Sequence, residues 1–114
     1  MDGAAAEERA LLFLQGQGLT LVARNWRCKA GELDLVLRDG ATVVITEVRG
    51  RGRADYGTAA ESIDWRKQRK LVRATRVLLA ARPELAEAPL RFDVVTLDAD
   101  GNIEWLREAF DAEE

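Results

Sequence analysis

The central segment of the chain is Gly31-Glu-Leu-Asp-Leu-Val-Leu-Arg-Asp-Gly-Ala-Thr-Val-Val-Ile-Thr-Glu-Val-Arg49. Two runs rich in branched apolar residues flank Asp39-Gly40. Asp-Gly between such runs is a strong signal for a tight β-hairpin, because the turn needs residues that accept positive φ angles. The segment therefore predicts a hairpin with its tip at Asp39-Gly40 and with Asp34 directly opposite Ile45.

Side chains alternate between the two faces of this hairpin, because successive residues of a strand point to opposite sides. The apolar face is expected to hold Leu33, Leu35, Leu37, Val44, Thr46 and Val48. The other face is expected to hold Glu32, Asp34, Glu47 and Arg49. In this register Asp34 and Glu47 are diagonal neighbours, with Cα atoms about 7–8 Å apart. Their carboxylates could share a hard cation such as Mg²⁺, and the alternative is that these side chains are simply solvated.

The rest of the chain alternates helical and strand patterns. A helix is expected over residues 4–16, a strand over 19–28, a loop over 50–60 and a second helix over 64–81, capped by Ser62 or Asp64. Strands over 90–97 and 103–106 and a frayed tail over 111–114 follow. The order α-β-β-β-α-β-β, with the second helix as a crossover, predicts one α/β domain over residues 1–114. Its central mixed sheet is flanked by helices.

Length and composition narrow the class of protein. A chain of 114 residues is expected to form one domain with a modest core. It shows no apolar run long enough to span a membrane and no secretory signal. A single cysteine and the absence of histidine exclude an internal disulfide and a histidine-based metal site. We therefore expect a cytoplasmic protein that does not contact a membrane.

Charge is distributed unevenly along the chain, although the net charge is only −3. Residues 49–76 contain nine Lys or Arg and three acids, whereas ten acids and two Arg follow from Glu84 onward. This polarity predicts a face that binds polyanions, and the alternative is a basic helix face that is only solvated. The basic residues expected to grip a nucleic-acid backbone are Arg51, Arg53, Arg66, Lys67, Arg69, Lys70 and Arg73. The three tryptophans are expected to pack in the core or at its edge, in preference to stacking on bases.

An ordered set of short motifs covers nearly the whole chain. It comprises Ala6-Glu7, Ala-Arg-Asn-Trp-Arg-Cys28, Gly31-Glu-Leu-Asp-Leu35, Thr46-Glu-Val-Arg49, Lys67-Gln-Arg-Lys-Leu71, Arg91-Phe-Asp-Val-Val95, Ile103-Glu-Trp105 and Ala109-Phe110. Together these motifs resemble the YraN-like family of bacterial proteins. That family is similar to the PD-(D/E)XK, or restriction-endonuclease-like, nucleases, and among them to archaeal Holliday-junction resolvases.

The resemblance implies a restriction-endonuclease-like α/β fold, dependence on Mg²⁺ or Mn²⁺, and DNA with a branched or otherwise unusual structure as ligand. By motif, Glu7, Asp34 and Glu47 match the metal ligands, and Asp34, Glu47 and Arg49 match the catalytic positions. Gln68 matches a helix glutamine that supports the site in some relatives, and we group it with the residues that face the nucleic acid. Resolvase-like relatives act as dimers, so a homodimer is expected by analogy.

Two positions depart from the family pattern: Ala6 stands where glycine is usual, and Arg49 replaces the lysine of the Glu-x-Lys motif. Arginine stays protonated and is a poor proton acceptor. Three hypotheses follow. The chain is a metal-dependent endonuclease, a non-catalytic nucleic-acid-binding module on a nuclease scaffold, or a structural domain whose basic helix is only solvated.

Overall fold

The computed structural model describes residues 2–51 and 63–112 of the chain. The elements along it are α1 (Gly3–Gly16), β1 (Thr20–Cys28), β2 (Gly31–Asp39), β3 (Thr42–Arg51), α2 (Trp65–Ala81), α3 (Pro83–Ala86), β4 (Leu90–Asp98) and β5 (Ile103–Phe110). The predicted order of the main elements is confirmed. Most of the predicted loop over 50–60 lies outside the described residues, and β3 includes its first two residues.

One short helix was not predicted. Pro83 follows the end of α2 and starts α3. Proline suits the first turn of a helix, where its missing N–H would have no partner in any case. The last strand, β5, is also longer than predicted and continues to Phe110.

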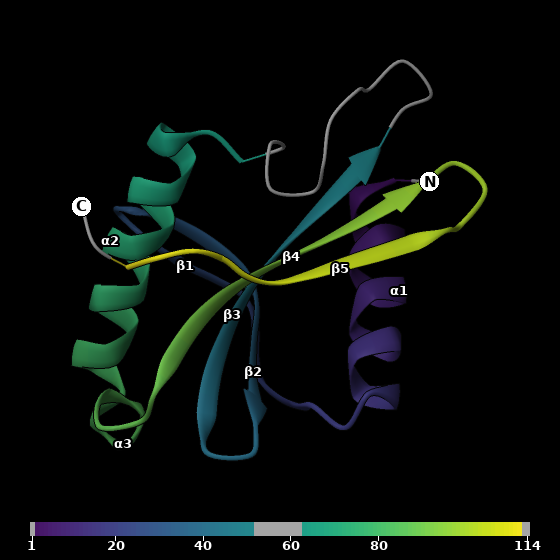
Figure 1. Cartoon of the computed structure of the whole chain (residues 1–114). Coiled ribbons are helices and arrows are strands. Elements are labelled where there is room, and N and C mark those ends of the chain that lie inside the picture. The colour runs from purple at the N-terminus through teal and green to yellow at the C-terminus, as the bar shows by residue number, and fades with distance from the viewer. Residues whose placement is uncertain (1, 52–62, 113–114) are drawn as a thin grey trace.

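A five-stranded mixed sheet forms the centre of the molecule, with the strand order β1-β2-β3-β4-β5. Neighbouring strands are antiparallel except for β3 and β4, which are parallel and are joined through α2. Helix α1 covers one face of the sheet and α2 covers the other (Figure 1). The α/β fold with a central mixed sheet flanked by helices is therefore confirmed.

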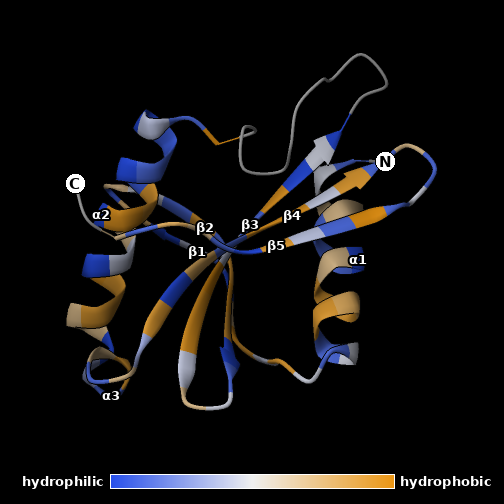
Figure 2. Ribbon diagram, viewed as in Figure 1, coloured by the Kyte–Doolittle hydropathy of each residue, from blue (hydrophilic) through white to orange (hydrophobic). Residues whose placement is uncertain are grey.

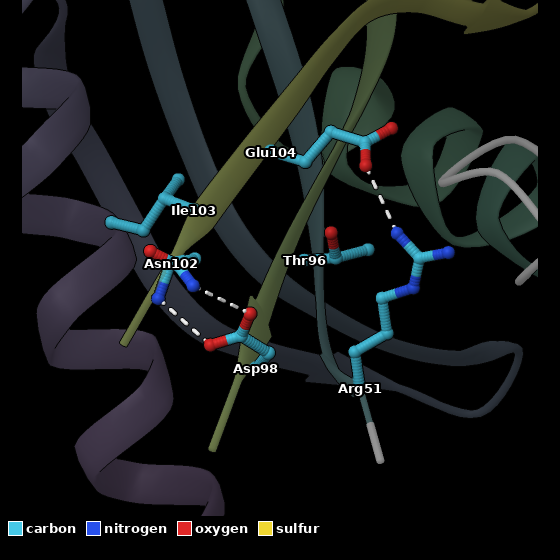
Figure 3. A pocket seen from close by; sticks show the side chains of 6 residues that line it. All are labelled: Arg51, Thr96, Asp98, Asn102, Ile103 and Glu104. Atoms are coloured by element: carbon cyan, nitrogen blue, oxygen red, sulfur yellow. Dashed lines mark hydrogen bonds and ion pairs between the residues drawn. The ribbon is translucent and has the colours of Figure 1, made fainter. Parts of the chain in front are cut away.

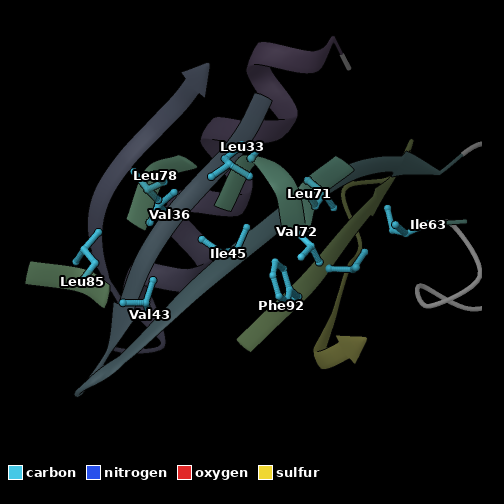
Figure 4. Close-up of a cluster of buried hydrophobic side chains, with 12 residues drawn as sticks. Leu33, Val36, Val43, Ile45, Ile63, Leu71, Val72, Leu78, Leu85 and Phe92 are labelled. Atoms are coloured by element: carbon cyan, nitrogen blue, oxygen red, sulfur yellow. The ribbon is translucent and has the colours of Figure 1, made fainter. Parts of the chain in front are cut away.

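Each face of the sheet has its own apolar core. Under α1 the core includes Leu14, Leu35, Leu37 and Val44. Under α2 it includes Val36, Ile45, Leu71, Leu78 and Phe92 (Figure 4). Hydrophilic and hydrophobic residues alternate along α2, as expected for a helix with one buried stripe (Figure 2). Among the described residues, no helix combines the length and apolar character needed to cross a membrane.

The hairpin forms, but its register differs from the predicted one by two residues. Asp39 pairs with Thr42 and Val36 pairs with Ile45, so the loop consists of Gly40 and Ala41. Gly40 has φ +60, whereas Ala41 is not among the described residues with positive φ. Positive φ at the first central position alone is typical of a type II′ turn, which prefers glycine there. A shift of two residues preserves the predicted faces, because side chains alternate with a period of two.

Leu33 is the exception to the predicted faces. It is fully buried in the core under α2, not in the core that contains Leu35 and Leu37. The last β2–β3 pair before it is Leu35 with Thr46, so regular pairing of the two strands has ended at this point. The predicted apolar face is therefore confirmed for Leu35, Leu37 and Val44 and is wrong for Leu33.

The N-terminus of α2 depends on one capping side chain, Asp64, whose Oδ1 accepts a hydrogen bond from the N–H of Lys67 at 2.9 Å. We expect Asp64→Ala to lower the free energy of unfolding by about 1 kcal/mol, because a backbone donor loses its partner. Urea denaturation measures this change. Asp111→Ala, which removes a carboxylate outside the helices, is the control, and equal losses in the two variants would contradict the capping role.

Candidate metal centre and nucleic-acid interface

Asp34 and Glu47 meet where the β2–β3 ladder ends. Asp34 Oδ2 accepts a hydrogen bond from the N–H of Val48 at 3.0 Å, so the carboxylate takes the place of a strand partner. Glu47 directly precedes Val48 in β3. It lies on the face covered by α2 and is only 5% exposed. The structure therefore brings together two of the predicted ligands, and the alternative of a solvated outer face is wrong for Glu47.

Burial raises the pKa of both carboxyl groups. The pKa of Glu47 is raised to about 7, first by burial and then by the nearby charge of Asp34. The pKa of Asp34 is also raised by burial, against the hydrogen bond from Val48. Glu47 Oε2 is buried and has no hydrogen-bond partner among the described residues. A buried carboxylate oxygen without a partner, beside a second carboxyl group, fits a site for a hard divalent cation.

Glu7 approaches this pair from α1. Its pKa is raised by burial and then by the charge of Asp34, and a hydrogen bond to the side chain of Asn25 opposes the shift. Sequence reasoning assigned no role to Asn25. Within residues 2–51 and 63–112, no group of three or more acidic, cysteine or histidine side chains is arranged to hold a metal ion. The structure thus pairs Asp34 with Glu47, and a ligand role for Glu7 stays a prediction.

Lys67 is the cation that reaches the carboxyl pair from α2. Its Nζ lies 3.5 Å from Glu47 Oε1. Arg49 is half-buried in β3, and its charge also lowers the pKa of Glu47, but by less than the charge of Lys67 does. Lys67 was predicted to grip a nucleic-acid backbone. The structure directs it at the predicted site, which the basic pattern of the sequence gave no means to foresee, and its contact with nucleic acid stays a prediction.

The other predicted nucleic-acid contacts are spread over several environments. Arg66, Lys70 and Arg73 are exposed and Arg69 is half-buried along α2. Gln68 donates a hydrogen bond from Nε2 to the carbonyl oxygen of Ile63 at 3.1 Å, and Arg53 lies outside the described residues. The exposed basic side chains therefore form a ridge on α2, while Gln68 stabilises the entry to that helix.

Of the three tryptophans, one contradicts its predicted packing role. Trp26 and Trp105 are half-buried, as expected for edge packing. Trp65 is 59% exposed at the start of α2. It precedes the apolar stripe of that helix and therefore does not contribute to the core.

A pocket of about 340 Å³ opens at the ends of β3, β4 and β5 (Figure 3), and it is lined by Arg51, Thr96, Asp98, Asn102, Ile103 and Glu104. Arg51 Nη1 forms an ion pair with Glu104 Oε2 at 2.9 Å, and Asp98 accepts a hydrogen bond from Asn102 Nδ2 at 2.9 Å. Because these charged groups already satisfy one another, the pocket lacks the charge pattern of a phosphate site. Arg51 would therefore have to give up its ion pair with Glu104 in order to contact a nucleic acid as predicted.

Asp93 lies on the strand next to β3 but does not join the carboxyl pair. It is paired with Thr46, so its side chain lies on the face opposite Glu47. It accepts hydrogen bonds from Arg91 Nε at 3.1 Å, from Trp105 Nε1 at 2.9 Å and from the N–H of Glu108 at 3.1 Å. These contacts give Asp93 a structural role between β4 and β5.

Comparison with known proteins supports the resemblance seen in the motifs. The model of the uncharacterised protein family UPF0102 matches residues 6–97. A UPF0102 protein of Pseudomonas entomophila (strain L48) is 52% identical over 113 residues, which cover 96% of this chain and 92% of the relative. A UPF0102 protein of Stutzerimonas stutzeri (strain A1501) is 48% identical over 114 residues, covering 97% and 95% of the two chains. The chain therefore belongs to the family UPF0102, also called YraN-like.

Proposed function

We propose that this protein is a metal-dependent DNA endonuclease that hydrolyses phosphodiester bonds in branched or structured DNA in the cytoplasm. The single observation that carries the proposal is the pair of half-buried Asp34 and buried Glu47, in which Glu47 Oε2 has no hydrogen-bond partner among the described residues. Two neighbouring carboxylates that are shielded from water are a costly arrangement unless a cation or a shared proton offsets their charge. A homodimer is part of this proposal by analogy with resolvases alone.

The carboxyl pair fits Mg²⁺ or Mn²⁺, since both ions prefer oxygen ligands. Asp34 and Glu47 would hold the ion, with Glu7 as the nearest further carboxylate. A bound divalent cation supplies Lewis acidity toward a phosphoryl oxygen and makes a nucleophilic water accessible at neutral pH. The protein supplies the fixed position of the carboxylates, because the Val48 N–H holds Asp34 and the covering helix α2 keeps Glu47 out of bulk water.

Lys67 and Arg49 supply positive charge beside this pair. Arg49 stands at the position of the motif lysine but remains protonated, so it can only bind and orient a phosphate. Lys67 is a compact ammonium 3.5 Å from Glu47 Oε1. We assign to Lys67 the stabilisation of the charge that develops at the scissile phosphate.

Lys67→Ala tests this assignment. The single-turnover rate on a branched DNA at saturating protein should fall by roughly 10²–10³-fold, while the DNA affinity changes much less, because Lys67 acts in the transition state. Lys29→Ala removes an exposed lysine from the turn between β1 and β2 and should leave the rate unchanged. If Lys67→Ala keeps the rate but binds DNA more weakly, the assignment is wrong and Lys67 contacts the DNA backbone.

The proposed endonuclease activity is tested with a panel of DNA substrates. Purified protein is incubated with duplexes, flaps, forks and four-way junctions in Mg²⁺ or Mn²⁺ and in EDTA. We expect cleavage of at least one branched substrate that requires the metal. The absence of cleavage across the panel with both metals would contradict the endonuclease proposal.

A second function is favoured by Arg49: a non-catalytic nucleic-acid-binding module on a nuclease scaffold. This alternative predicts salt-sensitive DNA binding without cleavage. Binding would survive Asp34→Asn and would weaken on Arg73→Ala. Gain of cleavage in Arg49→Lys would support the alternative, because only the proton-accepting group would have been missing.

A further inference from the structure

Trp65 forms an exposed aromatic surface at the start of α2. It is 59% exposed, and the guanidinium carbons of Arg66 and Arg69 each lie 5.6 Å from the centre of its ring. A large exposed apolar side chain loses the benefit of burial. The two guanidinium groups beside the ring also make the surroundings of this apolar side chain positively charged.

This surface continues along one side of the helix. Trp65, Arg69, Arg73 and Arg76 follow at intervals of four, four and three residues, which places them on one stripe. Each step of four residues advances the stripe by about 6 Å along the helix axis. The aromatic ring therefore stands at one end of a row of cations that can follow a phosphate backbone.

The stripe points away from the pair of Asp34 and Glu47, but it begins on the same turn of α2 as Lys67, which contacts that pair. Lys67, two residues after Trp65, points across the same turn toward Glu47 at 3.5 Å. Residues two apart in a helix differ by about 200° in direction, so Trp65 points outward where Lys67 points inward. A nucleic-acid strand that stacks on Trp65 would thus lie on the outer side of the first turn of α2. The inner side of the same turn carries Lys67, which faces the proposed cleavage site.

The combination of ring and cations matches one kind of ligand better than others. An anionic lipid or an acidic peptide would use the arginines but would leave the flat face of the ring without a flat partner. A nucleobase offers a π face that stacks on tryptophan, and its own phosphate is placed to meet the neighbouring arginines. Bases inside a duplex are already stacked on one another, so only an unpaired base can use the ring.

We propose that Trp65 and Arg69 form a stacking platform for an unpaired nucleobase, and that the protein therefore selects DNA that carries a single-stranded segment beside its duplex. This inference rests on the proposed function, since it names the substrate feature that the same face of the protein recognises. The platform binds through stacking, and the cations of the stripe bind without regard to sequence.

The test measures the affinity of labelled oligothymidylate and of a duplex of equal length at low salt, by fluorescence anisotropy. Trp65→Ala should weaken binding of the single strand by roughly tenfold and leave duplex binding nearly unchanged. Trp65→Phe should keep most of the single-strand affinity, because it retains an aromatic face. Arg73→Ala is the matched comparison, and it should weaken both ligands to a similar extent because it removes only a charge.

Three outcomes decide the proposal. Selective loss of single-strand affinity in Trp65→Ala, with recovery in Trp65→Phe, supports the platform. Equal effects on both ligands, or no effect, overturn the platform while DNA binding by the protein stands. Failure of the wild-type protein to bind either ligand overturns the platform together with the proposed function. Thermal unfolding of each variant checks that the substitutions leave the fold intact.

Discussion

Glu47→Gln is expected to abolish metal-dependent cleavage, with a loss of at least about 10³-fold in the single-turnover rate. The substitution preserves the size of the side chain but removes the negative charge beside Asp34. It also converts Glu47 Oε2, which lacks a partner among the described residues, into an amide position that cannot bind a cation as a carboxylate does. Cleavage of a labelled branched DNA in Mg²⁺ measures the effect, and circular dichroism confirms that the variant is folded.

A matched control is available on the neighbouring strand. Glu32→Gln removes a charge of the same sign near Asp34, and Glu32 is bound to Arg27 through an ion pair of 3.4 Å. This variant should cleave at close to the wild-type rate. Equal losses in Glu32→Gln and Glu47→Gln would show that general charge, and not the Asp34–Glu47 pair, controls activity. Wild-type activity in Glu47→Gln would contradict a metal-binding role for Glu47.

Stability in the absence of metal is expected to fall as the pH rises. The pKa of Glu47 is 4.5 in a model compound and about 7 in the folded protein. Between these values the folded state keeps a proton that the unfolded state has released. The contribution of the Glu47 carboxyl group to the free energy of unfolding is therefore complete below pH 4.5 and is lost as the pH rises through 7. Its size is of the order of 3 kcal/mol, because each pKa unit corresponds to about 1.4 kcal/mol.

Urea denaturation in EDTA at a series of pH values measures this profile. The raised pKa values of Asp34 and Glu7 act in the same direction. Glu47→Gln should flatten the profile, because its amide does not titrate. Mg²⁺ or Mn²⁺ at pH 8 should stabilise the wild type and leave Glu47→Gln unchanged, since a ligand that binds only the folded state raises its stability. Identical profiles for the two proteins would refute the assigned cause.

The fold could be predicted well because its strongest signals are local. The period-two pattern of the hairpin assigned Asp34 and Glu47 to one face, and a register error of two residues does not change the alternation behind that assignment. In the structure regular pairing ends before Asp34, and its carboxylate takes the place of a strand partner by accepting a hydrogen bond from the Val48 N–H. The register itself depended on which residues occupy the turn. Asp39-Gly40 was the favoured pair, but Gly40 takes the first central position and the turn begins one residue later. Leu33 changed face because pairing with β3 ends before it, a tertiary event without a local pattern.

The site was predicted only in part, for a different physical reason. Alternation along strands showed which residues share a face, but it did not show that α2 covers that face and buries Glu47. The same helix turns Lys67 inward and Trp65 outward. A pattern of basic residues indicates charge but not direction, so Lys67 was grouped with the surface cations and Trp65 with the core. Both assignments depend on how the crossover helix docks.

The most direct test of the central claim is anomalous scattering from crystals of the wild-type protein grown at pH 8 with Mn²⁺. The proposed metal centre predicts an anomalous peak that contacts the carboxylates of both Asp34 and Glu47, and no such peak in crystals of Glu47→Gln under the same conditions. A wild-type map with no peak between these two carboxylates would contradict it.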